Sequence, residues 1–333
     1  MPRRSPRGKP YHKPSNPNRQ RHGPRRSTAP GEHQPVLLAE VLATLAPQPG
    51  QVIVDCTLGY AGHSRAILEA IGTEGRLFAF DLDAGNLPTA QARLAEVGNP
   101  FSLHHGNFAG LAAILAEAGF ARVDGLMADL GMSSMQLDDP ERGFSLLRDG
   151  PLDMRMDRSR GRTAAELLET LSETDLAQAF LELGDEPAAA KIAAAIVAAR
   201  KTAPLQRTSE LRKLIERAVP VQILRGPGRP SERQQRLLPA IRVFQALRIL
   251  VNRELANLQN LLRTIPTVLN PGGRAVLISF HSGEDRLIKA AFREGVRRGL
   301  YRTAAEEPLR PSLEERQRNP RSRSAKLRWA QTA

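Results

Sequence analysis

The chain has 333 residues, 41% of them hydrophobic and only 4% aromatic, which predicts an aliphatic core for one large or two modest domains. Its one cysteine, Cys56, excludes an internal disulfide framework and a multi-cysteine metal site, and favours a reducing, cytoplasmic compartment. No apolar run is long enough to cross a bilayer, and no signal-peptide core stands at the N-terminus.

The net charge of +13 is concentrated at the two ends of the chain. Residues 1–30 hold seven Arg, two Lys and no acidic residue, and residues 309–333 hold seven basic and two acidic residues. Seven prolines and hardly any apolar side chains predict that residues 1–32 are a disordered basic tail. Basic ends suit a polyphosphate partner, because neutralised phosphates release counterions; a solubilising tail is the alternative.

From residue 33 onward, strand patterns alternate with helix patterns. Strands are predicted at 51–56, 76–81, 101–105 and 123–129, with helices at 63–71, 85–97 and 108–118. Such alternation indicates an α/β fold with a parallel sheet and helices on both faces. Residues 33–136 are therefore predicted to form the first part of the core.

The alternation stops near residue 137. Helical patterns alone follow, at 164–170, 175–183, 188–201 and 209–219, so residues 137–235 are predicted to be a helical insertion. One long helix is then expected, with an apolar stripe from Ile241 to Ile265 at spacings of three and four. After the break at 270–273, a strand at 274–280 resumes the sheet, so residues 236–333 are predicted to complete the core.

Two segments at the ends of the first two strands fit an adenosine cofactor. Gly59, Ala61 and Gly62 are small enough for the backbone to approach a ligand closely. Asp81 ends the second strand, where a carboxylate can accept hydrogen bonds from both ribose hydroxyls of NAD or of S-adenosylmethionine. The turn lacks the G-x-G-x-x-G pattern of dinucleotide sites, which favours a cofactor without a pyrophosphate.

Asp129 ends the fourth strand, next to the expected position of the cofactor's reactive group. A carboxylate at that place can hold a cationic or amine group through charge-assisted hydrogen bonds. The alternative is an aspartate that only caps a helix or stabilises a turn. The residues that follow, Leu-Gly-Met, differ from the Asp/Asn-Pro-Pro-aromatic motif of many amine methyltransferases, so that motif's mechanism is not transferred to this chain.

Longer stretches match a known family pattern in order along the chain. The most specific is Asp149-Gly-Pro-Leu-Asp-Met-Arg-Met-Asp157. The others include 33–38, 55–59, 62–64, 129–131, 133–134, 136–138, 142–145, 242, 244–249, 251–252, 271–273, 278–282, 284–286 and 319–328. On these residues the chain, from about 33 to 329, resembles the ribosomal RNA small-subunit methyltransferase H family, also called MraW.

The resemblance implies a Rossmann-like class I fold that uses S-adenosylmethionine to methylate N4 of a cytosine in the decoding region of small-subunit 16S rRNA. It implies that the helical insertion recognises substrate, and that no metal takes part. It also implies cofactor contacts at Ala61, Gly62, His63, Asp81, Phe108, Asp129 and Gln136. The chain departs from the family at Tyr60 and Ala61, where glycines are usual, and at Leu238 and Ile241, where the family usually has His and Thr.

Cytosine N4 is a poor nucleophile, so the reaction needs close positioning and a hydrogen-bond acceptor for the amine. Asp153 is the first candidate acceptor and His281 the second, with a purely structural role as the alternative for each. The base has to be single-stranded or flipped out of its stack. Along the predicted long helix, a polar stripe is expected to line the active-site mouth or to contact RNA, rather than to be only hydrated: Arg242, Gln245, Arg248 and Asn252.

Other classes of protein fit the residues less well. A cytosine-C5 methyltransferase needs a cysteine nucleophile, and the only thiol, Cys56, lies at the cofactor turn. The glycine pattern disfavours a dehydrogenase. A non-catalytic ribosome-assembly factor on the same fold is the remaining alternative, and methylation of a protein or small molecule is open by fold alone. The oligomeric state is not predicted.

Overall fold

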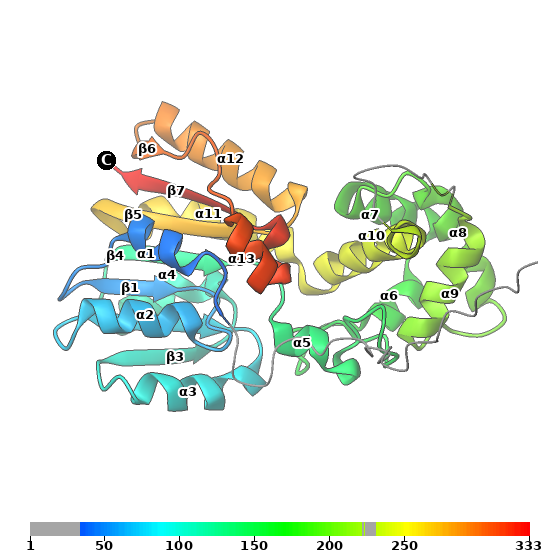
Figure 1. Ribbon diagram of the computed structural model, residues 1–333, viewed down its shortest axis with the longest axis horizontal. Helices are drawn as coiled ribbons and strands as arrows, with labels where there is room; N and C mark the ends of the chain where they lie inside the picture. Colours follow the sequence, from blue (N-terminus) through cyan, green and yellow to red (C-terminus); the bar gives the residue numbers. More distant parts are fainter. Residues whose placement is uncertain (1–33, 222, 224–230) are drawn as a thin grey trace, which may run out of the picture. The chain divides into compact units, whose positions relative to one another are not determined.

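A seven-stranded mixed sheet organises the chain (Figure 1). The structure is a computed structural model that describes residues 34–221, 223 and 231–333, so the predicted basic tail lies outside the described residues. The strands are β1 (Val52–Asp55), β2 (Arg76–Asp81), β3 (Phe101–His105), β4 (Val123–Asp129), β5 (Leu269–Ser279), β6 (Tyr301–Ala304) and β7 (Lys326–Thr332). Their spatial order is β3-β2-β1-β4-β5-β7-β6.

The first five strands of that order are parallel, which confirms the predicted α/β, Rossmann-like class of fold. The bounds predicted for β2, β3 and β4 match the structure. In the register, Asp55 pairs with Ala79 and Asp129 with Ile278, so the carboxyl ends of these strands meet at one edge of the sheet. Ligands bind at this edge in open parallel sheets.

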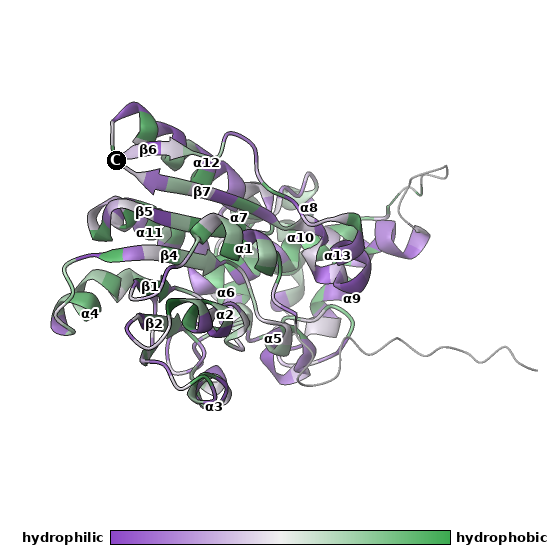
Figure 2. Ribbon diagram, turned by 60° about the vertical axis from the view of Figure 1, so that its left-hand side comes forward, coloured by the Kyte–Doolittle hydropathy of each residue, from purple (hydrophilic) through white to green (hydrophobic). Residues whose placement is uncertain are grey.

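Helices cover both faces of the sheet, because both faces carry buried apolar side chains. Along β1, Ile53 packs into one core cluster and Val54 into the other. The helices of the first cluster are α1 (Leu38–Leu45), α2 (Gly62–Ile71) and α3 (Leu87–Ala95). Those of the second are α4 (Leu111–Glu117), α11 (Glu254–Val268) and α12 (Ser282–Arg297). In Figure 2, α12 carries both hydrophilic and hydrophobic stretches, as a helix with one buried face should.

A third cluster of buried apolar side chains, separate from the two that pack on the sheet, lies among the helices that follow β4. These are α5 (Ser134–Asp138), α6 (Ala164–Thr170), α7 (Glu173–Gly184), α8 (Ala189–Arg200), α9 (Thr208–Ala218) and α10 (Glu232–Asn252). Phe180, Ile192 and Leu247 are fully buried within it. The helices predicted between 164 and 219 are therefore present, and α10 packs with them, away from the sheet in Figure 1.

The prediction of a single long helix from 241 to 265 is wrong. Arg253 has a φ of 52°, in the left-handed region, so α10 ends there and α11 begins at Glu254. The apolar stripe is divided accordingly: Phe244 and Leu247 pack among the insertion helices, whereas Leu258 and Ile265 pack against the sheet. Ile241, which was expected to face the core, is 43% exposed.

The last segment was not predicted in detail. β7 runs antiparallel between β5 and β6, and α13 (Leu313–Arg318) precedes it. The backbone N–H of Leu37 donates to Glu315 Oε1 at 2.9 Å, which ties α13 to the beginning of the described core. Among the described helices, none is both long and apolar enough to cross a membrane.

Candidate active site

A cavity opens at the carboxyl ends of β1, β2 and β4, and six of the seven residues expected to contact a cofactor line it. They are Gly62, His63, Asp81, Phe108, Asp129 and Gln136. The seventh, Ala61, is 1% exposed and is not among the lining residues. Its φ of 60° places it in the left-handed region at the N-cap of α2, which suits glycine better than alanine.

Asp55, the last residue of β1, stabilises the turn that follows this strand through hydrogen bonds of its carboxylate. Its Oδ1 accepts from the backbone N–H of Thr57 at 2.9 Å, and its Oδ2 accepts from Ser64 Oγ at 2.6 Å. Thr57 Oγ1 in turn accepts from the backbone N–H of Asp129 at 2.6 Å. The turns after β1 and β4 are therefore held together by side chains that come from one glycine-rich segment.

Asp81 faces the cavity with most of its acceptor capacity in use. Its Oδ2 accepts from the Gly59 backbone N–H at 2.9 Å and from Asn86 Nδ2 at 3.0 Å, and its Oδ1 accepts from the Asp83 backbone N–H at 2.7 Å. Burial raises the pKa of Asp81 to about 6. Since a carboxylate has about four acceptor positions, roughly one remains for a ligand, rather than the two expected for both ribose hydroxyls.

His63 and Asp129 face each other across the cavity wall, with Nδ1 and Oδ2 3.9 Å apart. The His63 ring is buried and its Nε2 lies 2.9 Å from the Val36 carbonyl, and burial lowers its pKa to about 4. Burial, together with the charges of Asp55 and Glu284, raises the pKa of Asp129 to about 8. Among the described residues Asp129 Oδ1 has no hydrogen-bond partner, so it is available to a donor from a ligand.

Gln136 lines the cavity, but its side-chain amide makes hydrogen bonds within the protein. Its Oε1 accepts from the Ser133 backbone N–H at 3.0 Å, and its Nε2 donates to Asp83 Oδ2 at 3.1 Å. The same Asp83 oxygen accepts from Arg142 Nη1. Arg142 Nη2 also donates to the carbonyl oxygens of Arg155 and Met156, at 3.0 and 2.8 Å. The network fastens the loop before α6 to the cofactor side of the cavity.

The structure does not bring Asp153 to the cavity. Its carboxylate accepts from Arg155 Nε at 2.7 Å and lies 3.4 Å from Arg158 Nε. Burial raises the pKa of Asp153, but the hydrogen bonds and charge of Arg155 outweigh burial, and the pKa is lowered. This geometry favours the structural alternative for Asp153, which shapes the loop 151–157.

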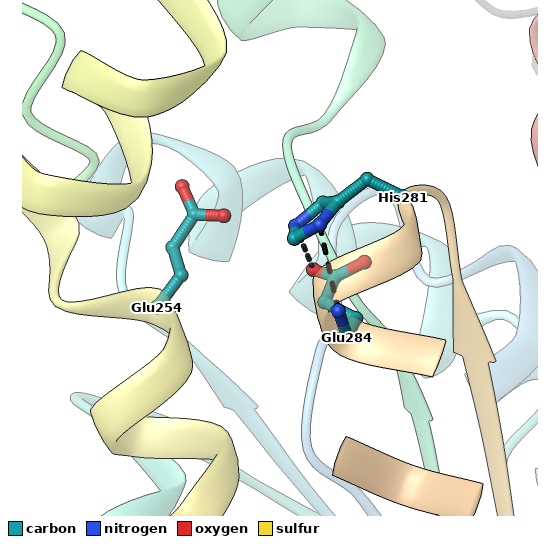
Figure 3. Close-up of side chains that lie close together, drawn as sticks. All are labelled: Glu254, His281 and Glu284. Carbon is teal, nitrogen blue, oxygen red and sulfur yellow. Dashed lines mark hydrogen bonds and ion pairs between the residues drawn. The ribbon is translucent and has the colours of Figure 1, made fainter. Parts of the chain in front are cut away.

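His281 lies beside the cavity at the N-cap of α12, where its Nδ1 accepts from the backbone N–H of Glu284 at 3.4 Å. Figure 3 shows it with two carboxylates that the sequence did not single out, Glu254 at the start of α11 and Glu284 on the first turn of α12. Both glutamates line the cavity. Each glutamate stands at a helix start, and for Glu254 that position is hidden in the sequence by the unpredicted break at Arg253.

The polar stripe of α10 makes protein contacts. Arg242 pairs with Glu186 at 3.5 Å, and Gln245 Nε2 donates to the Leu183 carbonyl at 3.0 Å. The other two members lie near the cavity: Arg248 binds Glu254, and Asn252 itself lines the cavity. Asn252 Oδ1 also accepts from the Met156 backbone N–H at 2.7 Å. The stripe connects α10 to its surroundings, and only its last residue reaches the cavity.

Comparison with known proteins identifies the family of this chain. The model of the MraW methylase family matches residues 31–333. The chain is 44% identical over 311 residues to a ribosomal RNA small subunit methyltransferase H of Geobacter sp. (strain M21), covering 89% of this chain and 97% of the relative. A protein of the same name from Geobacter sulfurreducens is 45% identical over 316 residues, covering 90% and 98%.

Proposed function

Because this chain belongs to the MraW methylase family, we propose that it transfers a methyl group from S-adenosylmethionine to N4 of a cytosine in 16S rRNA, within the small ribosomal subunit. The observation that carries the proposal is the cavity, in which the turn after β1 and two carboxylates, Asp81 and Asp129, meet at the carboxyl edge of the sheet. The decoding region and the cytoplasm are proposed as the places of action.

The residues of the cavity fit S-adenosylmethionine, which supplies an electrophilic methyl group when bound. The free Oδ1 of Asp129 suits the ammonium of its methionine part, and the remaining acceptor position of Asp81 suits a ribose hydroxyl. Gly62 lies so close to Pro35 that a Cβ there would come within 3.1 Å of the proline ring, so a larger residue would have to displace that ring by a few tenths of an ångström. No pyrophosphate-binding pattern is required.

An RNA substrate is supported by charge and by the names of the relatives. The curated relatives are named ribosomal RNA small subunit methyltransferases, and the excess positive charge of this chain stands at its two ends. Such ends are suited to phosphate backbones in a salt-dependent way. The specificity for cytosine N4 rests on the family resemblance of the motifs.

The direct test uses methyl-labelled S-adenosylmethionine and small subunits from cells that lack this gene. After incubation the RNA is digested and the labelled nucleoside identified. We expect label in N4-methylcytidine. Label in another nucleoside would keep the methyltransferase and discard the cytosine-N4 assignment. Cofactor binding without any label would favour the non-catalytic assembly factor.

A second expectation concerns pH and Asp129→Asn. The pKa of Asp129 is about 8 in the folded chain, against 3.8 as its ordinary value. Between pH 4 and 8 the folded protein therefore holds a proton that the unfolded chain has lost, and this contribution to stability is lost as the pH rises through that window. The asparagine amide does not titrate, so the variant does not lose this stability as the pH rises. The cofactor-free variant should therefore melt several degrees above wild type at pH 9, with a smaller difference at pH 5.

The same variant should bind S-adenosylmethionine roughly tenfold more weakly or worse, because an amide replaces the carboxylate that holds the ammonium. Thermal melts at pH 5, 7 and 9 and calorimetric titration give the two readouts. A melting difference that is constant across pH would contradict the raised pKa, and unchanged affinity would contradict the ammonium contact.

A further inference from the structure

We propose that the Glu284 carboxylate receives the proton released from the amine during methyl transfer, and that His281 and Arg248 are positioning residues that keep this carboxylate ionised. The inference rests on the proposed function and deepens it, since it names the proton acceptor for the amine. It replaces Asp153, which lies outside the cavity lining, and gives His281 an indirect role.

Glu284 has the position that an acceptor needs. It lines the same cavity as Asp129 and Phe280, yet only 2% of its surface is exposed. Its Oε2 accepts from the backbone N–H of Phe280 at 2.9 Å, which fixes the carboxylate from the β5 side. Its Oε1 lies 3.3 Å from His281 Nε2, a contact drawn in Figure 3. Glu284 also acts on Asp129, since its charge contributes to the raised pKa there, so the two acids share one cavity.

Four segments around Glu284 contribute a charged or titratable group. They are His281 before α12, Arg248 on α10, Glu254 on α11 and Asp129 on β4. Burial raises the pKa of Glu284, but the contact with His281, the Phe280 N–H and the charge of Arg248 outweigh burial. The pKa is lowered as a result, so Glu284 is a carboxylate at neutral pH and can accept a proton.

A metal ion is a poorer interpretation of the same cluster. Ligand atoms of Glu254, His281 and Glu284 lie within 4.8 Å of one another, as a cation site would require. Both oxygens of Glu254, however, already accept from Arg248, whose Nε and Nη2 each lie 2.8 Å away. The arginine and glutamate side chains are about nine-tenths buried. The guanidinium of Arg248, bound through two nitrogens, thus already compensates the negative charge of Glu254 that a metal ion would neutralise.

The proton balance of the step is simple. The N4 lone pair forms the new C–N bond while the electrons of the breaking C–S bond stay on sulfur. N4 then carries one proton too many, and Glu284 takes it, while the electrons of that N–H bond return to nitrogen. Glu284 becomes a neutral carboxylic acid and releases the proton to solvent once the product leaves. No further reactant is needed.

The test compares Glu284→Gln with wild type in the subunit assay. The amide keeps an oxygen for the Phe280 N–H but cannot take a proton. We expect kcat to fall about a hundredfold or more, with the Kd for S-adenosylmethionine within about threefold of wild type. Asp285→Asn is the matched control: Asp285 stands one residue further on α12 and binds Lys326 and Arg328, at 2.8 and 2.7 Å. That variant should keep kcat.

His281→Gln supplies a readout that a structural role would not move. Without the imidazole the pKa of Glu284 should rise, and the acid limb of the pH profile of kcat should move up by about one pH unit. A Glu284→Gln enzyme with kcat within about threefold of wild type, or an acid limb that stays in place in His281→Gln, would overturn the inference. Wild type that labels a nucleoside other than N4-methylcytidine would instead overturn the proposed function.

Discussion

Asp81→Ala is expected to weaken binding of S-adenosylmethionine by roughly a hundredfold or more and to remove methyl transfer at working cofactor concentrations. One charge-assisted hydrogen bond to a ribose hydroxyl contributes about 1.5–3 kcal/mol, which alone corresponds to roughly 10- to 150-fold in affinity. The carboxylate also holds Gly59 and Asn86, so the turn that shapes the cavity loses its anchor. Calorimetric titration of the purified variant measures the loss directly.

Asp124→Ala is the matched control for this loss. Asp124 stands near the opposite end of β4, where its carboxylate accepts from the Val52 N–H and from Asn270 Nδ2, both at 2.8 Å. Its removal disturbs the sheet by a comparable number of hydrogen bonds but leaves the cavity intact. Equal losses of cofactor affinity in the two variants would show that Asp81 acts only through stability.

Arg142→Ala should lower the stability of the protein by about 3 kcal/mol or more, because it leaves a buried carboxylate without its cation. Arg142 and Asp83 are each 11% exposed, and the Arg155 and Met156 carbonyls also lose their donor. For a chain of 333 residues the expected fall in melting temperature is roughly 4–5 °C or more. Cofactor affinity should fall as well, since Gln136 shares Asp83 with the lost arginine.

Arg148→Ala is the control that tests whether removal of any arginine from this segment lowers the stability as much as Arg142→Ala does. The Arg148 side chain is 47% exposed and lies 3.8 Å from Asp138, so its removal should cost about 1 kcal/mol or less. Thermal melts of the two variants side by side decide the point. A drop for Arg142→Ala no larger than that for Arg148→Ala would contradict the assigned role of the Asp83–Arg142 pair.

β1, β2 and β4 were predictable because they are short apolar runs with sharp ends. β2 ends at Asp81 and β4 at Asp129, and in both cases the acid that stops the apolar run also faces the cavity. The same property allowed these two cavity-lining carboxylates to be identified in the sequence. β7 gave no such signal, because its charged residues Lys326 and Arg328 are paired with Asp285, a contact no local pattern reveals.

The remaining features depend on side-chain partners and backbone conformations that hydrophobic periodicity does not reveal. Gln136 was expected to contact a cofactor, and the structure engages its amide with Ser133 and Asp83. Asp153 was expected to be an acceptor, and its nearest arginines instead hold it in the loop. The break between α10 and α11 lies at Arg253, in a left-handed backbone conformation that arginine rarely adopts. The apolar spacing of the sequence continues across this residue. It therefore gives no sign that Glu254 begins a new helix.

The insertion between β4 and β5 also sets an order of events during synthesis. β5 pairs directly with β4, yet the insertion helices separate the two strands along the chain. At translation rates of about 5–20 residues per second, the open edge of β4 waits on the order of 10 s for its neighbour. Closing so long a loop is entropically slow, whereas the insertion helices make local contacts and can fold first. Nascent chains arrested before β5 should therefore expose the unpaired edge of β4, which can pair with another chain and aggregate.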